Sequence, residues 1–266
     1  MYTFLQLVVS VVTVENNIEL FSKMRNCSTE YRECKLKEFA IRDSPSRYIV
    51  IHYSRAKCRK ERMIRVLRNA TFIETNDAAR IDVNTLNNCT SPRLCENLPT
   101  MTQTSCTMKH MIAWNVASQS RFEYSVIVED DMIFGGQFFN ALHRKIKSLP
   151  DWEIFNVGCS RNKEISRGPV FCSRAYAVTR KGARKLIRNT PKIVETCDGT
   201  ILKSSSSLKS YHANLPIVHG SQTSKGSLPR GYDMCDGYAN HVEEARARAH
   251  RYYNRMKFDR TTTDDS

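Results

Sequence analysis

The stretch YSVIVEDDMIF, residues 124–134, is the feature that most limits what the chain can fold into. Its run VIV is short, apolar, β-branched and bounded by polar residues, which is typical of a buried strand in a parallel sheet. Glu129, Asp130 and Asp131 follow directly, at the strand's carboxyl end, where open α/β sheets bind their ligands. Since alternate side chains of an extended backbone share a face, we expect Glu129 and Asp131 to point one way and Asp130 the other.

These acids predict a divalent cation site. Two carboxylates that converge on one point repel each other unless a cation lies between them. Hard oxygen ligands suit Mg²⁺ or Mn²⁺, which commonly bridge protein carboxylates to a substrate's phosphates. We therefore expect Asp131 and Glu129 to be metal ligands. The alternative is a solvated strand end at which an Asp caps the next helix.

Strands alternate with helices along the chain, which predicts an α/β sheet. We expect strands within residues 48–53, 70–78, 126–128, 151–158 and 171–180, and helices within 55–69, 105–118, 138–149 and 181–189. Residues 82–104 are expected to be irregular, and the serine-rich run 203–210 to be a mobile loop.

We expect a single catalytic domain over residues 47–224, preceded by a signal-like, anchor-like or stem segment (1–46) and followed by a loop and charged helical tail (225–266). The apolar run at residues 4–14 is shorter than the ~20 residues that span a bilayer, but it has the length of a signal-peptide core. No basic residue precedes it, so a buried strand or helix stays open beside a secretory signal or membrane anchor.

The formal net charge of +14 and the pI near 9.4 indicate an anionic partner, which could be nucleic acid, a membrane surface or a phosphorylated small molecule. The ten cysteines include no C-x-x-C pair, which disfavours zinc-finger and thioredoxin-like sites. Together with glycosylation sequons at Asn26, Asn69 and Asn88, they favour disulfides and an oxidising secretory lumen, the endoplasmic reticulum or Golgi of a eukaryote.

The order of motifs resembles glycosyltransferase family 25, which includes bacterial lipooligosaccharide and animal procollagen galactosyltransferases. The family's first strand and Arg-rich helix are matched by YIVIHYSRAKCRKERM, and its EDD hallmark by VIVEDDM. Its Cys-x-x-Ser-His segment followed by Trp is matched by SCTMKHMIAW, with Lys109 in place of Ser. The aromatic strand and helix correspond to AYAVTRKGARKLI, and the Pro-x-Asp-like turn to ETCDGTIL, which contains Asp198.

The resemblance implies a GT-A fold, a mixed nucleotide-sugar-binding sheet flanked by helices. It also implies transfer of a hexose, most often galactose, from a UDP-sugar to a hydroxyl of a glycan, a lipid-linked glycan or a hydroxylysine, with inversion at the anomeric carbon. Because a diphosphate departs, a bound Mn²⁺ or Mg²⁺ would act as a Lewis acid at the developing anion.

By family position, Asp198 is the candidate general base that deprotonates the acceptor hydroxyl, with Glu195 as the next carboxylate to test. His110 is expected to orient the site from its helix. The residues expected to bind the nucleotide sugar are Tyr53, Arg55, Arg59, Glu129 and Asp130, with Lys60 nearby.

Each of these residues also has a structural interpretation. Asp198 could cap a helix, His110 could be a buried core group, and the cations near Arg55 could simply be solvated. His219, a possible third metal ligand, could be a polar strand end.

Two other function classes stay open. One is an inactive secreted binding protein that keeps the transferase fold. The other is a metal-dependent nuclease or nucleic-acid-binding protein. No predicted helix interleaves aromatic with basic residues, as a stacking platform for nucleic acid would. The expected partners are therefore a nucleotide sugar and a glycan, glycolipid or protein acceptor, and not nucleic acid.

Overall fold

The computed structural model describes residues 46–81, 101–157, 164–169, 172–215 and 217–219. At its centre is a seven-stranded sheet in the order β2-β1-β3-β7-β5-β8-β6. The strands are β1 (Tyr48–Ile51), β2 (Thr71–Ile73), β3 (Tyr124–Glu129), β5 (Ile154–Asn156), β6 (Ser166–Arg167), β7 (Ala175–Thr179) and β8 (Ser210–His212). Two further strands, β4 (Met132–Phe134) and β9 (Ile217–His219), form a small antiparallel sheet.

The strand directions determine which ends meet. β1 runs parallel to both β2 and β3, and β5 runs parallel to β8. β7 is antiparallel to both of its neighbours, β3 and β5. The carboxyl ends of β1, β2, β3, β5 and β8 therefore lie on the same edge as the amino end of β7. This mixed sheet flanked by helices confirms the predicted fold class.

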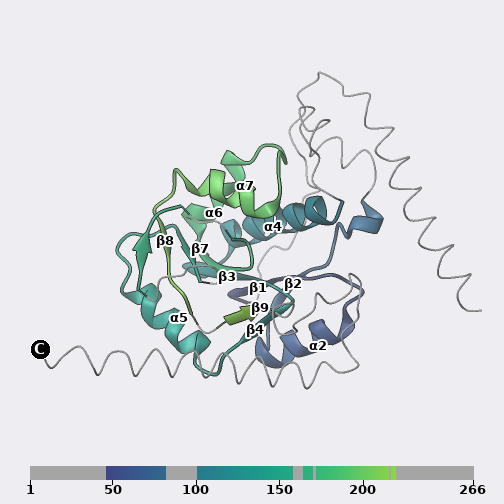
Figure 1. Cartoon of the computed structure of the whole chain (residues 1–266), viewed down its shortest axis with the longest axis horizontal. Coiled ribbons are helices and arrows are strands. Elements are labelled where there is room, and N and C mark those ends of the chain that lie inside the picture. The colour runs from purple at the N-terminus through teal and green to yellow at the C-terminus, as the bar shows by residue number, and fades with distance from the viewer. Residues whose placement is uncertain (1–45, 82–100, 158–163, 170–171, 216, 220–266) are drawn as a thin grey trace, which may run out of the picture.

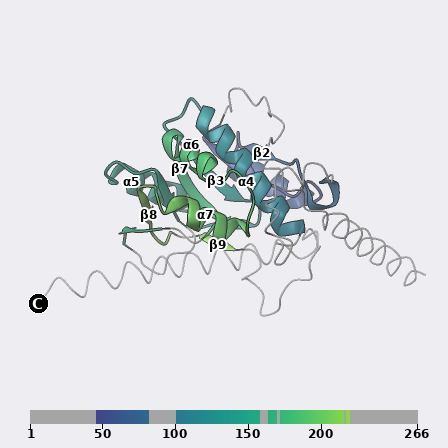
Figure 2. The ribbon, with the colours of Figure 1, turned by 90° about the horizontal axis from the view of Figure 1, so that it is seen from above.

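Helices cover both faces of the sheet. They are α2 (Lys57–Val66), α4 (Met101–Gln119), α5 (Phe138–Lys147), α6 (Arg180–Asn189) and α7 (Cys197–Ser205), with a 3₁₀ turn, η1 (Ala78–Arg80). Figure 1 shows α4, α6 and α7 on one side of the sheet, and α2 and α5 on the other. The view in Figure 2 looks onto the face that α4, α6 and α7 cover.

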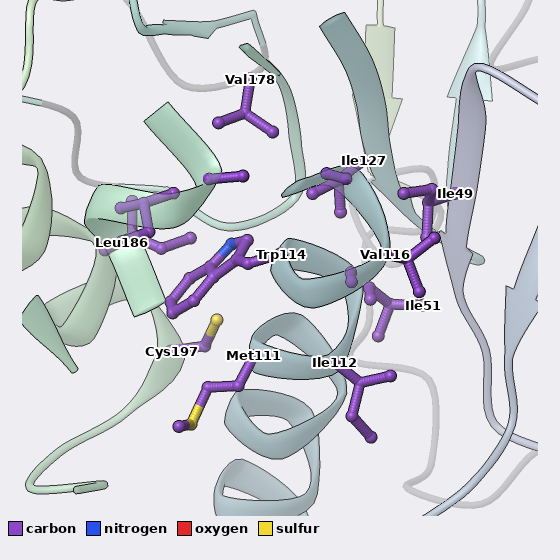
Figure 3. Close-up of a cluster of buried hydrophobic side chains, with 14 of the residues drawn as sticks. Ile49, Ile51, Met111, Ile112, Trp114, Val116, Ile127, Val178, Leu186 and Cys197 are labelled. Carbon is purple, nitrogen blue, oxygen red and sulfur yellow. The ribbon is translucent and has the colours of Figure 1, made fainter. Parts of the chain in front are cut away.

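The period-two alternation of the strands produces two cores. Ile127 of β3 points into the core beneath α4, α6 and α7, together with Val178 of β7 and Trp114 of α4 (Figure 3). Val126 and Val128, the neighbours of Ile127 along β3, point into the opposite core, under α2 and α5. Because both faces are covered, a nearly continuous apolar strand is what this position requires.

The prediction of a mobile loop over residues 203–210 is wrong. α7 continues to Ser205, β8 begins at Ser210, and Ser204, Ser205 and Ser210 are buried. Their hydroxyls have partners inside the protein, since Ser204 Oγ lies 2.7 Å from Thr190 Oγ1 and Ser210 Oγ donates to the Ser205 carbonyl at 2.8 Å. Composition alone indicated a linker, but satisfied hydroxyls allow serine to be buried.

Several other expectations are tested only in part. The irregular segment expected over 82–104 is helical from Met101, where α4 begins, and its earlier part lies outside the described residues. The apolar run 4–14, Asn26, Asn88 and the tail 225–266 also lie outside them, so the domain boundaries stay predictions. In the described part of the chain, every helix is too short or too polar to span a membrane.

Candidate functional site

The acidic run lies where the sequence predicts it. β3 ends at Glu129, and Asp130 and Asp131 form the turn that leads into β4. The Glu129 amide donates to the Arg174 carbonyl at 2.8 Å, just before β7 begins. The carboxyl end of β3 therefore meets the chain that enters β7.

One serine brings two carboxylates together at this edge. Ser173 Oγ lies 2.7 Å from Glu129 Oε1 and 2.8 Å from Asp198 Oδ1. The Ser173 amide also donates to Asp198 Oδ1, at 2.8 Å. A hydroxyl has one hydrogen to donate, so it cannot satisfy both carboxylates as donor at once. A cation beside this carboxylate pair, Glu129 and Asp198, would balance the negative charge that the hydroxyl leaves uncompensated.

Asp198 lies on a helix, not on the predicted turn. It is the second residue of α7, whose preceding Thr196 accepts a hydrogen bond from the Gly199 amide through its side chain at 3.5 Å. The partial positive charge of a helix amino terminus stabilises a carboxylate there. Helix α7 therefore places the Asp198 carboxylate in its first turn, where it contacts Ser173.

Asp130 contacts different groups from those around Glu129, as the alternation of side chains along a strand predicts. Its Oδ2 lies 2.7 Å from His52 Nδ1 and accepts from the Tyr53 amide at 3.0 Å, and its Oδ1 accepts from Arg59 at 2.9 Å. Arg62 donates to the main-chain carbonyl of Asp130. This buried carboxylate thus joins β3, the loop after β1 and α2, and both of its oxygens already have cationic or amide partners.

The other residues expected to bind the nucleotide sugar lie around the same loop. Tyr53 is 39% exposed and Arg55 is exposed, so both side chains are open to a ligand at this edge. Arg59 is held by Asp130. Lys60 instead pairs with Glu74 at 2.6 Å and lies over the ring of Phe72. Their roles stay predictions.

The remaining candidate ligands differ in position. Asp131 is half-buried in the turn between β3 and β4. The backbone of His219 pairs with Met132 of β4, one residue after Asp131. Glu195 forms an ion pair with Lys203 and packs against Gly199, so it lies over the first turn of α7.

His110 lies behind the carboxylate pair and is fully buried. Its Nδ1 is 2.9 Å from Tyr176 Oη, which also accepts from Trp114 Nε1 at 2.7 Å, and its Nε2 is 3.7 Å from Glu129 Oε1. Burial lowers the pKa of His110, but the nearby Cys106 and Glu129 more than offset this and raise it to about 9. Among the described cysteines, Cys106 and Cys197 are free, and Cys58 and Cys172 are disulfide-bonded.

Sequence reasoning missed two features of the site. Ser173 carried no signal, because its two carboxylate partners come from distant parts of the chain. Lys109 did carry a signal in the sequence, because it stands where the motif of family 25 has a Ser. It forms a buried ion pair with Asp77 and donates to the His52 carbonyl at 2.5 Å, so it fixes the loop that carries Tyr53.

Comparison with known proteins agrees with the motifs. A search of curated proteins finds no match to this chain. The family model of glycosyltransferase family 25 (LPS biosynthesis protein) matches residues 46–167, a range that contains the acidic run and His110 but ends before Ser173 and Asp198. Residues 46–167, a little under half of the chain, are therefore similar to glycosyltransferase family 25, and the activity that this similarity implies is glycosyl transfer.

Proposed function

We propose that the protein is a metal-assisted, inverting hexosyltransferase that moves a hexose, galactose first among the candidates, from a UDP-sugar to an acceptor hydroxyl. The observation that carries this proposal is the convergence of Glu129 and Asp198 on Ser173, at the edge where β1 and β3 end. This convergence gives one site both a place for a cation and a general base, and such a transfer needs both.

The donor set at this edge fits a hard divalent cation, Mn²⁺ or Mg²⁺. The carboxylate pair has more negative charge than one shared hydroxyl can satisfy, and the half-buried Asp131 lies two residues from Glu129. Glu129 and Asp131 would hold the ion, whereas the Asp130 oxygens already bind His52, Tyr53 and Arg59. When bound, such an ion supplies Lewis-acid stabilisation of the departing diphosphate.

Asp198 takes the proton of the acceptor hydroxyl as that oxygen attacks the anomeric carbon. Both Ser173 donors act on Oδ1, so the proposal assigns Oδ2 to the acceptor. Ser173 is buried, which gives the carboxylate a fixed orientation. A single attack on the face opposite the departing nucleotide inverts the anomeric centre.

The loop after β1 provides the nucleotide side of the site. Asp130 fixes Arg59 and the Tyr53 backbone, and the exposed side chains of Tyr53 and Arg55 provide a ring and a cation for the base and diphosphate. The acceptor is a glycan, a glycolipid or a hydroxylysine. The disulfide-bonded Cys58 and Cys172 support a secretory lumen as the compartment.

The test is Asp198→Asn in the full chain, assayed with UDP-hexoses and Mn²⁺. Because the variant keeps the shape but loses the base, transfer should fall by roughly 10²–10⁴-fold while donor affinity stays the same. A chelator should abolish wild-type transfer, and added Mn²⁺ should restore it. Asp151→Asn is the matched control, since that exposed carboxylate pairs with Lys209 before β5 begins and should leave transfer unchanged.

Other outcomes assign other functions. An equal loss of donor affinity and rate would place Asp198 in the nucleotide-sugar pocket. A folded wild-type protein that binds UDP but neither transfers nor hydrolyses any UDP-hexose would be the inactive binding protein. Full activity in chelator would remove the metal from the mechanism.

A further inference from the structure

A second cluster of possible metal ligands lies in the core between α4 and α7. One ligand atom each from Cys106, His110 and Cys197 lies within 4.8 Å of the others. Cys106 and His110 are four residues apart on α4 and so share one face of that helix, and Cys197 is the first residue of α7. Figure 3 shows Cys197 facing α4, beside Trp114 and Met111.

The environment of His110 is that of a positioned metal ligand. Tyr176 Oη has two lone pairs, and it can accept from both Trp114 Nε1 and His110 Nδ1. A ligating histidine typically directs its other ring nitrogen to such an oxygen, which fixes the tautomer and the ring. Nε2 is buried and makes no hydrogen bond with any described residue. Once this nitrogen gives up its proton, its lone pair can bind a metal ion inside the cluster.

We propose that Cys106, Cys197 and His110 bind Zn²⁺. Two thiolates and an imidazole are soft and borderline ligands that select zinc over Mg²⁺ or Mn²⁺. Zinc–ligand bonds of about 2.0–2.3 Å place neighbouring tetrahedral ligands roughly 3.5–4 Å apart, so binding needs a small contraction of the cluster. The two thiols and the His110 imidazolium release their protons to solvent as the ion binds, and the two thiolate charges balance that of the ion.

This site is distinct from the proposed hard-ion site in ligands and in role. Zinc there would join α4 to the first turn of α7, directly before Asp198. The two sites are neighbours, since Glu129 Oε1 lies 3.7 Å from His110 Nε2. The sequence contains no C-x-x-C motif that would predict this zinc site, because the fold and not a local motif brings the two thiols together. We therefore assign zinc a positioning role for the helix that carries Asp198.

The test begins with the full-length wild-type protein, purified with a reducing agent and freed of loosely bound metal. We expect one equivalent of zinc. Replacement by Co²⁺ should give the intense visible bands of a tetrahedral ion and a thiolate-to-cobalt charge-transfer band in the near ultraviolet. Both spectra report ligand identity without any assay of transfer, so failure of the proposed function would leave them unchanged.

Cys197→Ser should lower zinc affinity by at least about 100-fold, which exceeds the ~10–100-fold typical of losing an outer-shell partner, and should remove part of the charge-transfer band. The matched control is His143→Gln. That histidine also contacts tyrosines, Tyr124 at 2.7 Å and Tyr48 at 3.2 Å, but it lies on α5 at the other face of the sheet. It should leave zinc affinity unchanged.

Three results would overturn the proposal. One is a reduced wild-type protein that binds neither zinc nor cobalt. The second is a Cys106–Cys197 disulfide, found by peptide mapping of protein from its native host. The third is full retention of zinc by a folded double variant, Cys106→Ser with Cys197→Ser. The first two use wild-type protein and hold even if the variants fail to fold.

Discussion

At the scale of single residues, a buried ion pair fixes the loop between β1 and α2. Lys109 and Asp77 are almost fully buried and contact each other, and Ser54 donates to the same carboxylate through its side chain and its amide. Burial raises the pKa of Asp77, but the bonds from Lys109 and Ser54 outweigh it and lower the pKa below its ordinary value. The loop with Tyr53 therefore depends on a charge pair between η1 and α4.

Lys109→Met should destabilise the protein by about 3–5 kcal/mol, because it leaves the Asp77 carboxylate buried without its cation. Urea unfolding at pH 7 measures the loss. The double variant Lys109→Met with Asp77→Asn should recover part of it, since the uncompensated charge is gone. If the single and double variants lose the same amount, the pair does not stabilise this loop.

Residue positions were predictable from the sequence where the signal was local. Glu129 and Asp131 follow an apolar run whose period identifies the strand, so their place at the sheet edge could be predicted. The convergence of Glu129 and Asp198 on Ser173 could not be predicted, because it depends on β7 entering the sheet antiparallel beside β3. Cys106 and Cys197 meet for a similar reason, through packing of α4 on α7.

At the scale of elements, α6 lies unusually close to the start of β5. A Cβ on Gly182 would lie 2.2 Å from the Glu153 carbonyl oxygen and 2.9 Å from its carbon. The Gly182 amide also donates to Thr179 Oγ1 at 3.0 Å, which caps the helix. Glycine is therefore required here by the close approach of two backbones.

Gly182→Ala should destabilise the protein by about 1–3 kcal/mol, because α6 must move away from β5 to admit a methyl group. The denaturant midpoint measures this loss. Gly136→Ala is the matched control, since a Cβ there would meet nothing within 4 Å. A Gly182→Ala midpoint equal to that of Gly136→Ala would show that α6 shifts without loss.

The longest helix was predictable, and the two strands β6 and β8 at one end of the sheet were not. The helix expected over 105–118 is α4, which extends four residues further at its start and one at its end. By contrast, β6 and β8 have two and three residues, too few for a period to emerge. Such strands are fixed by their neighbours, so only the assembled sheet reveals them.

At the scale of the whole molecule, the large positive charge is balanced locally by buried acids. Glu153, with a side chain only 1% exposed, lies 2.7 Å from Lys185 and 3.3 Å from Lys181 of α6. It also accepts from the Lys209 amide at 3.1 Å, just before β8. One carboxylate thus connects β5, α6 and β8. On a chain of net charge +14, each lost carboxylate also adds repulsion.

The stability of the protein should therefore fall in acid, partly through Glu153. Burial raises the pKa of Glu153, but the bonds from Lys185, Lys209 and Lys181 outweigh it, so the folded pKa lies below its ordinary value. A lowered pKa stabilises the fold fully above the unfolded value, and this contribution disappears as the pH falls through the folded pKa.

Glu153→Gln should accordingly lose about 1.5–3 kcal/mol of unfolding free energy at pH 7, the range for hydrogen bonds to charged groups. As the pH falls below the unfolded pKa and then through the lower folded pKa, the wild-type carboxyl gains its proton, so the gap in stability between wild type and variant should narrow and then close. Urea unfolding from pH 7 to pH 3 measures both limits. Glu123→Gln, at an exposed position, should track the wild type throughout. General charge repulsion acts on both proteins alike, so a gap that persists unchanged at pH 3 would show that Glu153 contributes by packing and not by charge.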